Sequence, residues 1–372
     1  MTKAAELAKI GEVATNSQIG GRRNIVINGG MNVAQRSASV TGIGASSGYF
    51  TCDRWKITTA NSAGRLTMTQ TADGPNGISA NCLKLDCTTA DTSIAAGELL
   101  VLQNHIEGQD LQGIGKGVTG AKEVTLSFYV KANAAFDFVA EIKDVDNNRT
   151  NGRVFATTTD WVRHEITFQA DVDDGSSPFD DDNALSLLVN FWLHAGTTYT
   201  GGTLASNWEN GTEANRAAGI DSFYSSTDNN FFLTGVQLEV GSQATPFENR
   251  SFGEELALCQ RYFQQWTQEA SGFSTNNYAA VCDVVMHGDT YAFMQYVHPV
   301  QLRATAALTF NGNYVANLSG VDRAISSLQV NTSTPYVTSF YGTTPDNNEA
   351  GQAGFMRANN DGDASIFFNS EL

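Results

Sequence analysis

Apolar and polar residues alternate in short runs along most of the chain, and clusters of Gly, Ser, Thr and Asn separate the runs. An alternation with period two places successive side chains on opposite faces of a strand, so each run predicts a half-buried β-strand. In the clearest run Val236, Leu238 and Val240 alternate with polar residues, and Gly241 ends the run. Equivalent runs predict strands over 24–28, 54–58, 65–70, 82–87, 99–106, 124–131, 136–143, 161–169, 185–193 and 231–240.

Strands of this length, separated by turn clusters, are typical of an all-β protein built as an antiparallel sandwich. The last strand is expected to lie beside the first, which favours a jelly-roll β-sandwich over 24–250. The composition agrees, because charged residues make up only 16% of the chain and 35 glycines accompany 6 prolines. A polar insertion at 195–230 is longer than most loops and is therefore a candidate for a functional role.

A linker helix is expected after the sandwich, within 251–269. Ser251 and Glu254 have the spacing of a capping box at a helix start. The apolar residues that follow are spaced like the seam of a coiled coil. They are Phe252, Leu256, Cys259, Phe263 and Trp266. This seam predicts a homotrimer interface shared with neighbouring β-domains, and the alternative is a single helix packed on its own sandwich.

A second β-rich region follows at 270–372. Runs of period two predict strands over 278–287, 290–300, 307–310, 327–330, 336–341 and 365–368, with one more at 355–356. A region of about 100 residues fits one compact, sandwich-like domain.

The N-terminal segment 1–23 combines a short amphipathic helix with a polar, glycine-rich arm. A helix this short is marginal in water and needs a surface to pack on. The segment is therefore predicted to anchor the protein to a larger assembly through Leu7, Ile10 and Val13, and the alternative is a disordered tail.

The formal net charge of −17 argues against free DNA or RNA as a partner, because a surface of that sign repels phosphate. No apolar run approaches the length of a membrane span, so membrane insertion is not expected. The 5 cysteines are odd in number and form no CxxC motif, which disfavours zinc and a disulfide framework. Together with the absence of a signal peptide, this pattern favours synthesis in a reducing cytoplasm.

Neither HExxH nor a phosphate-binding P-loop occurs, and no catalytic constellation stands out, so the chain is not expected to be an enzyme. No cofactor is expected either, with calcium as the one alternative. Asp144, Asp146 and Asn148 begin like a calcium loop, but the glycine and the closing glutamate of that loop are missing. A solvated turn is the more common interpretation of such a stretch.

Sugar binding uses exposed aromatic faces flanked by amides and carboxylates. Aromatic residues in polar segments are therefore the candidates, although each one is also suited to cover the end of a sandwich. Those considered are Tyr49, Phe50, Tyr199, Trp208, Phe223, Tyr224, Phe273, Tyr314 and Tyr341. The residues predicted to bind a receptor glycan are Tyr314, Tyr341, Asn311, Asn313 and Asn347, with Trp208 and Tyr224 from the insertion.

Three segments together resemble the tail-fibre proteins of marine bacteriophages, cyanophages included. They are AAELAKIGEV…NVAQRS at 4–37, the Asp53-Arg54-Trp55 step, and GVQLEVGSQATPFENRS at 235–251. The resemblance extends over about 1–266. It implies a trimeric virion protein whose first domain resembles carbohydrate-binding jelly rolls. In those modules an acid in the last strand often binds a structural calcium, and no Asp precedes Val236 here.

The resulting hypothesis is a tail-fibre or tail-tip adhesin, made in the host cytoplasm and located in the virion tail. Its N-terminus would bind other tail proteins, and its C-terminal domain would bind a glycan or protein on the host surface. A purely architectural virion component and a polysaccharide depolymerase are the alternatives. A depolymerase usually carries a long repetitive β-helix, and no such repeat is visible.

Overall fold

The structure is a computed structural model. The residues it describes are 22–172, 177–267, 278–345 and 348–372. Leu7, Ile10 and Val13, the predicted contact residues of the N-terminal helix, lie outside them.

The chain forms two compact units. Unit 1 comprises Met1–Glu255 and Leu372, and unit 2 comprises Leu256–Glu371. They correspond to the two predicted β-domains. The predicted linker at 251–269 does not form a separate unit, because the boundary between units 1 and 2 falls within its helix.

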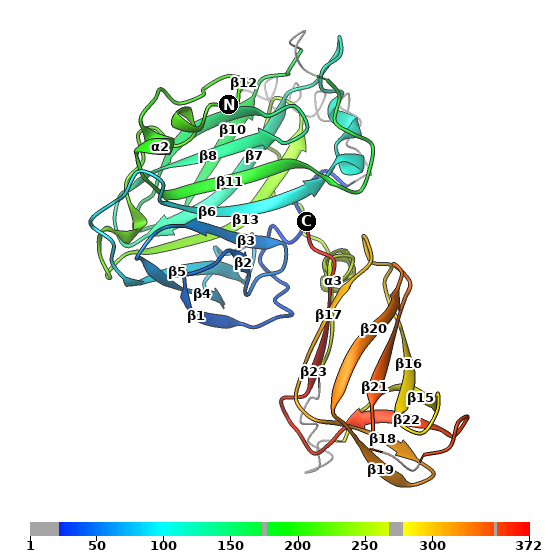
Figure 1. The fold of residues 1–372 in the computed structure, drawn as a ribbon. Coiled ribbons are helices and arrows are strands. Elements are labelled where there is room, and N and C mark those ends of the chain that lie inside the picture. Colours follow the sequence, from blue (N-terminus) through cyan, green and yellow to red (C-terminus); the bar gives the residue numbers. More distant parts are fainter. Residues whose placement is uncertain (1–21, 173–176, 268–277, 346–347) are drawn as a thin grey trace. The chain divides into compact units, whose positions relative to one another are not determined.

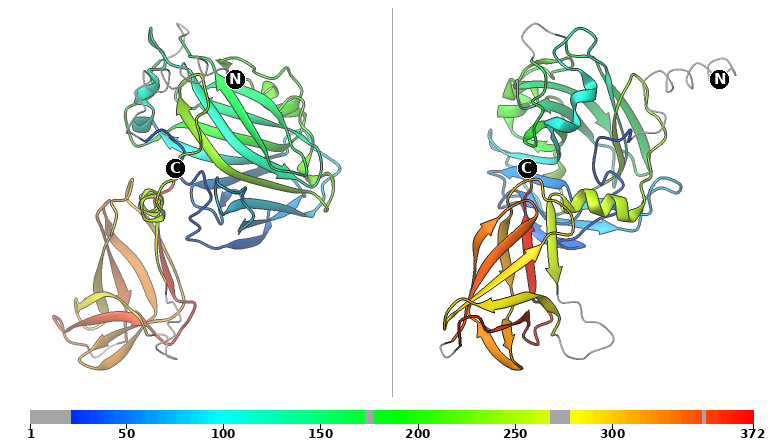
Figure 2. Two further views of the ribbon diagram at one scale, coloured as in Figure 1. Left: turned by 180° about the vertical axis from the view of Figure 1, so that it is seen from behind. Right: turned by 90° about the vertical axis from the view of Figure 1, so that its right-hand side faces the viewer.

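Unit 1 is an antiparallel β-sandwich of two sheets, which Figures 1 and 2 show as stacked layers. Sheet A has the strand order β1-β4-β5-β13-β7-β10, and sheet B has the order β12-β9-β8-β11-β6-β3-β2. The strands are β1 Ser39–Ile43, β2 Gly48–Tyr49, β3 Trp55–Ala60, β4 Arg65–Thr71, β5 Cys82–Thr89, β6 Leu99–Glu107, β7 Val124–Ala132, β8 Asp137–Asp144, β9 Arg149–Ala156, β10 Val162–Phe168, β11 Leu185–Ala195, β12 Glu209–Asn210 and β13 Asn230–Val240.

The chain repeatedly crosses between these sheets. It passes from β5 in sheet A to β6 in sheet B, returns in β7, and crosses again to β8, β10, β11 and β13. This is the jelly-roll sandwich predicted from the alternation. Short helices lie in the connections: η1 Gly108–Asp110, η2 Gln112–Ile114, α2 Thr197–Thr200, η3 Glu213–Asn215 and η4 Phe223–Ser225.

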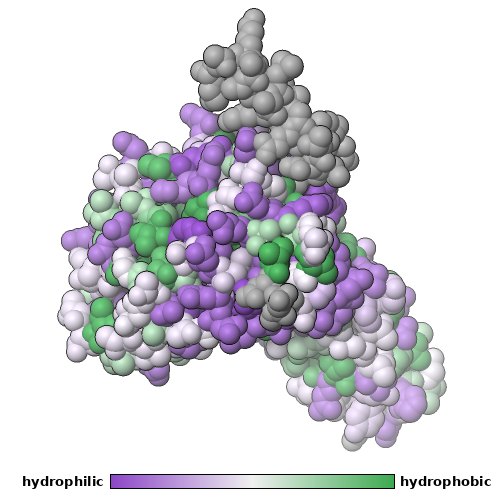
Figure 3. Space-filling model, turned by 90° about the horizontal axis from the view of Figure 1, so that it is seen from above, coloured by the Kyte–Doolittle hydropathy of each residue, from purple (hydrophilic) through white to green (hydrophobic). Residues whose placement is uncertain are grey.

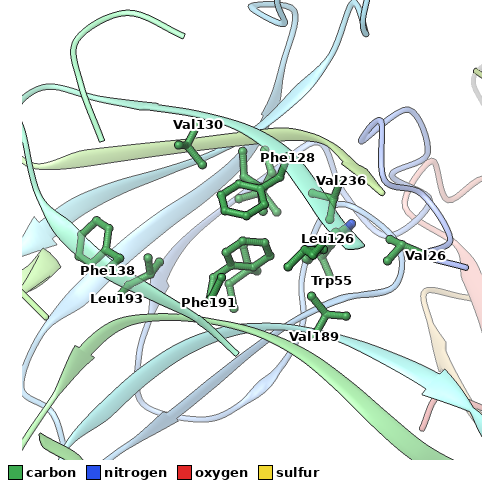
Figure 4. Close-up of a cluster of buried hydrophobic side chains, with 14 of the residues drawn as sticks. Val26, Trp55, Leu126, Phe128, Val130, Phe138, Val189, Phe191, Leu193 and Val236 are labelled. Carbon is green, nitrogen blue, oxygen red and sulfur yellow. The ribbon is translucent and has the colours of Figure 1, made fainter. Parts of the chain in front are cut away.

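The core of unit 1 lies between the two sheets. Figure 4 shows Phe128 of β7 facing Phe191 of β11, with Trp55 of β3 beside them. All three side chains are fully buried, and the Phe128 and Phe191 rings meet edge to face at 5.0 Å. Burial of each such ring stabilises the fold by roughly 1.5–3 kcal/mol. The inward positions are those that the period-two alternation selects.

The strand predicted at 24–28 is not formed, although the segment lies beside β13 as expected. The amide of Ile25 donates to the carbonyl of Leu238 at 2.9 Å. Beyond this bond, the backbone amides of Val26 and Leu238 donate to the side-chain oxygen of Asn24 instead of to carbonyls of a neighbouring strand. At Asn28 the backbone turns with a φ of 58°, so the segment ends there.

The insertion at 195–230 covers the outer face of sheet B. Its Tyr199 and Ala217 pack against an apolar cluster that includes Trp192. The guanidinium of Arg216 donates to both carboxylate oxygens of Glu141 at 2.9 Å and lies 4.8 Å from the Trp192 ring centroid. The insertion therefore covers Trp192 and Val139 on the outer face of sheet B, whereas Val154 of β9 stays 45% exposed.

Unit 2 is a second antiparallel sandwich. Sheet C has the order β14-β23-β17, and sheet D has the order β19-β18-β22-β15-β16-β21-β20. The strands are β14 Phe263–Thr267, β15 Ala280–Met286, β16 Tyr291–Val297, β17 Ala307–Asn311, β18 Tyr314–Leu318, β19 Val321–Ile325, β20 Ser327–Ser333, β21 Val337–Thr343, β22 Ala353–Ala358 and β23 Ser365–Asn369. The core includes Met294 and Phe340 of sheet D with Ile366 and Phe368 of sheet C.

The predicted helical seam is wrong beyond Gln260. Helix α3 spans Phe252–Gln260, and its first turn is capped as expected, with the Ser251 hydroxyl accepting from the Glu254 amide at 3.3 Å. Phe263 and Trp266 instead belong to β14, where pairing with β23 outweighs helix propensity.

The other seam residues do not form an apolar stripe. Phe252 is 62% exposed, Leu256 is half-buried and Cys259 is fully buried. Phe263 is buried and Trp266 packs against the core of unit 2. The homotrimer stays a prediction, without the coiled-coil seam on which it was based.

The surface of unit 1 is mixed in character. Figure 3 shows hydrophobic residues as separate patches among hydrophilic ones on the face in view. In the ranges that the structure describes, no helix combines the length and the apolar composition that a membrane crossing requires. All 5 cysteines are free thiols.

His298 connects the two sheets of unit 2. Its Nδ1 lies 3.1 Å from Gln264 Oε1 on β14, and its Nε2 lies 3.0 Å from Thr338 Oγ1 on β21. Burial lowers the pKa of this imidazole to about 4, below its ordinary value of 6.5. The folded protein therefore holds His298 neutral in a pH range where the unfolded chain protonates it.

This linkage predicts an acid-sensitive unit 2. The contribution of His298 to stability is fully present above a pH of about 6.5 and is lost as the pH falls toward about 4, because the unfolded state binds the proton first. Urea unfolding at a series of pH values measures the effect. His298→Gln is expected to flatten the pH dependence in this window, and His287→Gln, at an exposed position, serves as the control variant. Identical pH profiles for His298→Gln and the wild type would contradict the prediction.

Candidate functional site: an exposed aromatic sheet face

Within the residues that the structure describes, one face of sheet D in unit 2 is uncovered and carries aromatic side chains. In β16, Ala292 and Met294 point into the core and are buried. The alternate residues Tyr291 and Phe293 point outward, and Tyr291 is 53% exposed. Exposed aromatic rings on a sheet are unusual because burial is strongly favourable, so such a face indicates a binding surface.

The strand register brings a third ring to the same place. Phe293 lies directly opposite Tyr341 of the neighbouring strand β21, and these two strands lie side by side in Figure 1. The Tyr341 ring centroid is 5.5 Å from that of Phe293 and 6.5 Å from that of Tyr291. Cross-strand neighbours are held at this separation by the backbone ladder. The three rings, Tyr291, Phe293 and Tyr341, are called the aromatic face below.

Apolar residues extend the aromatic face across the sheet. Val285 of β15 lies opposite Phe293 and is 45% exposed. Phe355 of β22 lies opposite Asp283 and is 40% exposed.

Polar side chains border the aromatic face. Gln329 of β20 lies opposite Tyr341, and Gln295 follows Phe293 on the same side of β16. Both amides are exposed and have no side-chain hydrogen bond within the described part of the chain. An amide donates and accepts, so these groups are able to pair with hydroxyls of a ligand. The combination of flat apolar rings and free amides suits a ligand with one apolar face and a polar edge.

Tyr341 is one of the residues predicted to bind a glycan, and the structure places it on this face. Tyr314, the other predicted ring, is buried with 3% exposure, and its hydroxyl donates to the Asn311 carbonyl at 2.9 Å. Burial raises the pKa of the Tyr314 phenol. The prediction that Tyr314 binds a ligand is therefore wrong, because its inward position commits it to the core.

The predicted asparagine partners are not brought to Tyr341. Asn311 and Asn313 lie at the turn between β17 and β18, and β18 is separated from β21 by three strands of sheet D. Asn313 donates to the Asp361 carboxylate at 2.8 Å through its side chain. Asn347 lies outside the described residues.

The two predicted rings of the insertion serve the fold of unit 1. Tyr224 is fully buried, as is its neighbour Phe223. Trp208 packs against the core and donates its indole N–H to the carbonyl of Gln169 at 2.8 Å. These rings cover the sandwich, which was the alternative interpretation for them. Their assignment to glycan binding is therefore wrong for Tyr224 and finds no support for Trp208.

Of the remaining aromatic candidates, one lies outside the described residues and three contact other groups of unit 1. Phe273 lies outside the described residues. Tyr199 packs against the Trp192 ring, and Phe50 packs against the core. Tyr49 is half-buried beside the cationic groups of Arg36 and Lys56.

Sequence reasoning missed Tyr291, Phe293 and Phe355. A signal was present in β16, where aromatic residues occupy both parities of the alternation, with Tyr291 and Phe293 on one and Tyr296 on the other. When a strand carries large apolar residues on both faces, one face packs on the core and the other is either exposed or covered by a partner.

A lysine stands where the alternative calcium site was placed. The Asp144 carboxylate is fully buried and lies 2.5 Å from the ammonium of Lys116. Lys116 also lies 3.4 Å from Asp171, whose carboxylate binds Arg149 at 2.8 Å and 3.0 Å. These four residues, Lys116, Asp144, Arg149 and Asp171, form a buried ion cluster.

The other two residues of the suggested calcium loop have structural roles that do not involve a metal ion. Asp146 accepts the backbone amide of Asp180 at 3.1 Å, and burial raises the pKa of its carboxyl. Asn148 adopts a left-handed turn with a φ of 48°. No group of three or more acidic, His or Cys side chains within the described residues is placed to hold a metal.

A Gly-x-Ser-x-Gly sequence occurs at 44–48 and bears on the question of catalysis. In hydrolases this motif forms a strained turn between a strand and a helix. Here it lies between strands β1 and β2, and Ser46 is exposed, without a histidine hydrogen-bonded to it among the described residues. The sequence match therefore lacks the structural context that would support a nucleophile.

Comparison with known proteins gives likenesses of fold at low identity. No family model matches the chain, and no curated protein matches it. Among solved structures, the enzymatically active domain of tailspike protein 4 from bacteriophage CBA120 is 12% identical with a TM-score of 0.31, covering 58% of this chain and 21% of that one. The chain thus spans about a fifth of the tailspike's length.

Two carbohydrate-binding modules are similar in the same sense. A xylan-binding CBM22-1 domain from Paenibacillus barcinonensis is 11% identical, with a TM-score of 0.28, covering 60% of this chain and 100% of that one. A family 11 module of a Clostridium thermocellum cellulase is 12% identical, also with a TM-score of 0.28, covering 56% and 99%. Likenesses at this level carry no functional argument, so function is argued below from the side chains.

The buried ion cluster yields a prediction about metal dependence. Lys116→Met leaves two buried carboxylates to share Arg149, and removal of one partner from such a cluster is expected to cost about 3–5 kcal/mol. Chemical unfolding measures this loss, and Lys122→Met, at an exposed position, is the matched control. Calcium and a chelator should leave wild-type stability unchanged, since the ammonium already neutralises Asp144. A rise of the wild-type unfolding midpoint with calcium, or a Lys116→Met variant as stable as the control, would overturn this assignment.

Proposed function

We propose that the chain is a glycan-binding adhesin and that the aromatic face of unit 2 is its binding surface. The observation that carries the proposal is the outward trio Tyr291, Phe293 and Tyr341, held side by side by the register of β16 and β21. The C–H face of a sugar ring packs on an aromatic ring, and its hydroxyls pair with amides such as those of Gln295 and Gln329.

The geometry favours binding over catalysis. The aromatic face is a sheet surface that presents rings and amides, without an enclosed pocket or a nucleophile and base in contact among the described residues on it. An open face of this kind gives weak affinity for a single sugar chain, because it buries only one side of the ligand. Several copies acting together on a surface would make that affinity useful.

A place in a phage tail rests on the resemblance of the segments 4–37, 53–55 and 235–251 to marine phage tail fibres. In this proposal the N-terminal segment binds other tail proteins, the protein is a homotrimer in the virion tail, and unit 2 contacts the host. A head or tail component without a receptor is the second candidate, and a depolymerase is the third.

Replacement of the aromatic face tests the proposal. Phe293→Ala combined with Tyr341→Ala removes two rings worth on the order of 1 kcal/mol each in stacking. Binding of the full chain to its best ligand on a glycan array should weaken about tenfold or more. Tyr336→Ala is the matched control, because Tyr336 is 60% exposed but lies in the turn before β21.

Three results would decide between the candidates. If the double variant binds glycan as well as the wild type does, the aromatic face is not the binding surface. An absence of binding to any glycan, together with an altered sedimentation coefficient of the double variant, assigns the face to subunit packing in an architectural protein. Release of reducing sugar from a bound polysaccharide would replace binding with depolymerase activity.

A further inference from the structure

Unit 1 contains a hollow that the aromatic face of unit 2 does not explain. It has a volume of about 550 Å³ and lies at the connection between β4 and β5, where residues 72, 74 and 76–80 meet Asn32 and Asn249. Every lining residue is uncharged. In a chain with a net charge of −17, a hollow without a charged wall is a distinct chemical environment.

The loop that forms the hollow is fixed by its own hydrogen bonds. The Gly74 amide donates to the Ala80 carbonyl at 3.2 Å, and the Ile78 amide donates to the Pro75 carbonyl at 3.1 Å. A Cβ at Gly74 would lie 2.1 Å from the Ser79 carbonyl oxygen, so only glycine permits this closure. The Ser79 hydroxyl ties the loop to the Gly30 carbonyl at 2.6 Å. The hollow is therefore shaped before any ligand arrives, which lowers the entropic cost of binding.

Unpaired amides line this fixed hollow. Asn76 and Asn249 are exposed, and their side chains have no hydrogen-bond partner within the described structure. Asn32 uses its Oδ1 to accept from Ser79 and Asn81, whereas its Nδ2 has no such partner there. Each amide group offers donors and acceptors that match the hydroxyls of a sugar.

An aromatic pair stands at the rim of the hollow. Trp161 donates its indole N–H to the carbonyl of Asp73, which lies between two lining residues of the loop. The Trp161 and Phe232 ring centroids are 6.2 Å apart, and both rings are half-buried on the outer side of sheet A. Lys131 binds the Asp73 carboxylate at 2.6 Å, so the charges at the rim are balanced. The same ammonium lies 5.2 Å from the Trp161 ring centroid and 4.6 Å from that of Phe232, so a sugar would stack on the Trp161 face that Lys131 leaves open.

From this juxtaposition we infer that unit 1 carries a second ligand site, which binds an uncharged oligosaccharide in the hollow. Asn76 and Asn249 pair with its hydroxyls, and Trp161 packs on an apolar sugar face at the rim. The uncharged lining and the negative net charge disfavour uronic-acid and sulfated glycans. The site is independent of the aromatic face, since it lies in the other unit and is formed by a loop rather than by a sheet face.

Saturation-transfer difference NMR on the full chain tests this site, with cellotriose, xylotriose, mannotriose and β-1,4-galactotriose as probes. At least one of them should receive saturation. The Asn76→Ala/Asn249→Ala variant should bind it about tenfold more weakly, because two hydrogen bonds are lost. Trp161→Ala should weaken binding as well. Asn210→Ala is the matched control, since Asn210 is exposed on β12 of the opposite sheet.

The outcomes separate this site from the aromatic face. A signal that survives in Phe293→Ala/Tyr341→Ala but falls in Asn76→Ala/Asn249→Ala supports the hollow, whatever the fate of unit 2. A signal lost only in Phe293→Ala/Tyr341→Ala overturns the hollow and leaves the proposed function intact. Absence of saturation transfer to all four probes, or equal binding by Asn76→Ala/Asn249→Ala and Asn210→Ala, overturns it too. Circular dichroism checks that each variant is folded.

Discussion

The sandwich of unit 1 depends on a buried hydrogen-bond junction around Asn28. The Asn28 side chain accepts from the amide of Val33 at 3.0 Å and donates to the carbonyls of Val33 and Asp53 at 2.8 Å. Its backbone carbonyl accepts the indole N–H of Trp55 at 3.0 Å, and its amide donates to the carboxylate of Glu255 at 2.5 Å. Since all these groups are buried, removal of the junction would leave several polar atoms without partners, each costing about 1–3 kcal/mol.

This junction brings together parts of the three segments 4–37, 53–55 and 235–251. Asn28 belongs to the opening segment and Asp53 and Trp55 to the central step. The closing segment contributes Arg250, which donates to the carbonyls of Asn24 and Val26. The three segments are far apart in sequence but meet at one place in the fold. These segments therefore close the sandwich, and their meeting does not by itself locate a ligand.

Binding surfaces occur where the fold leaves rings or amides uncovered. On sheet B the insertion covers Trp192, and the buried ion cluster neutralises Asp144 with Lys116. On sheet D no described segment covers Tyr291 and Phe293 in the same way, and at the hollow of unit 1 the amides of Asn76 and Asn249 stay free. Buried polar groups are expected to have hydrogen-bond partners within the fold. Residues with such partners are therefore structural, whereas exposed amides without them are candidates for binding a ligand.

The sequence alone determined the all-β class, the two β-domains and most strands of the sandwich, because a period of two is a local property that strands such as β7 and β13 retain in the fold. It also pointed to Tyr341. It did not determine which parity of a strand faces inward when both are apolar, so Tyr314 and Tyr341 looked alike. Packing of sheet C on sheet D decided that Tyr314 is buried in the core, whereas Tyr341 lies half-buried on the outer face. Long-range pairing likewise made Phe263 and Trp266 part of a strand, since β23 lies about a hundred residues further along the chain and local spacing cannot report it.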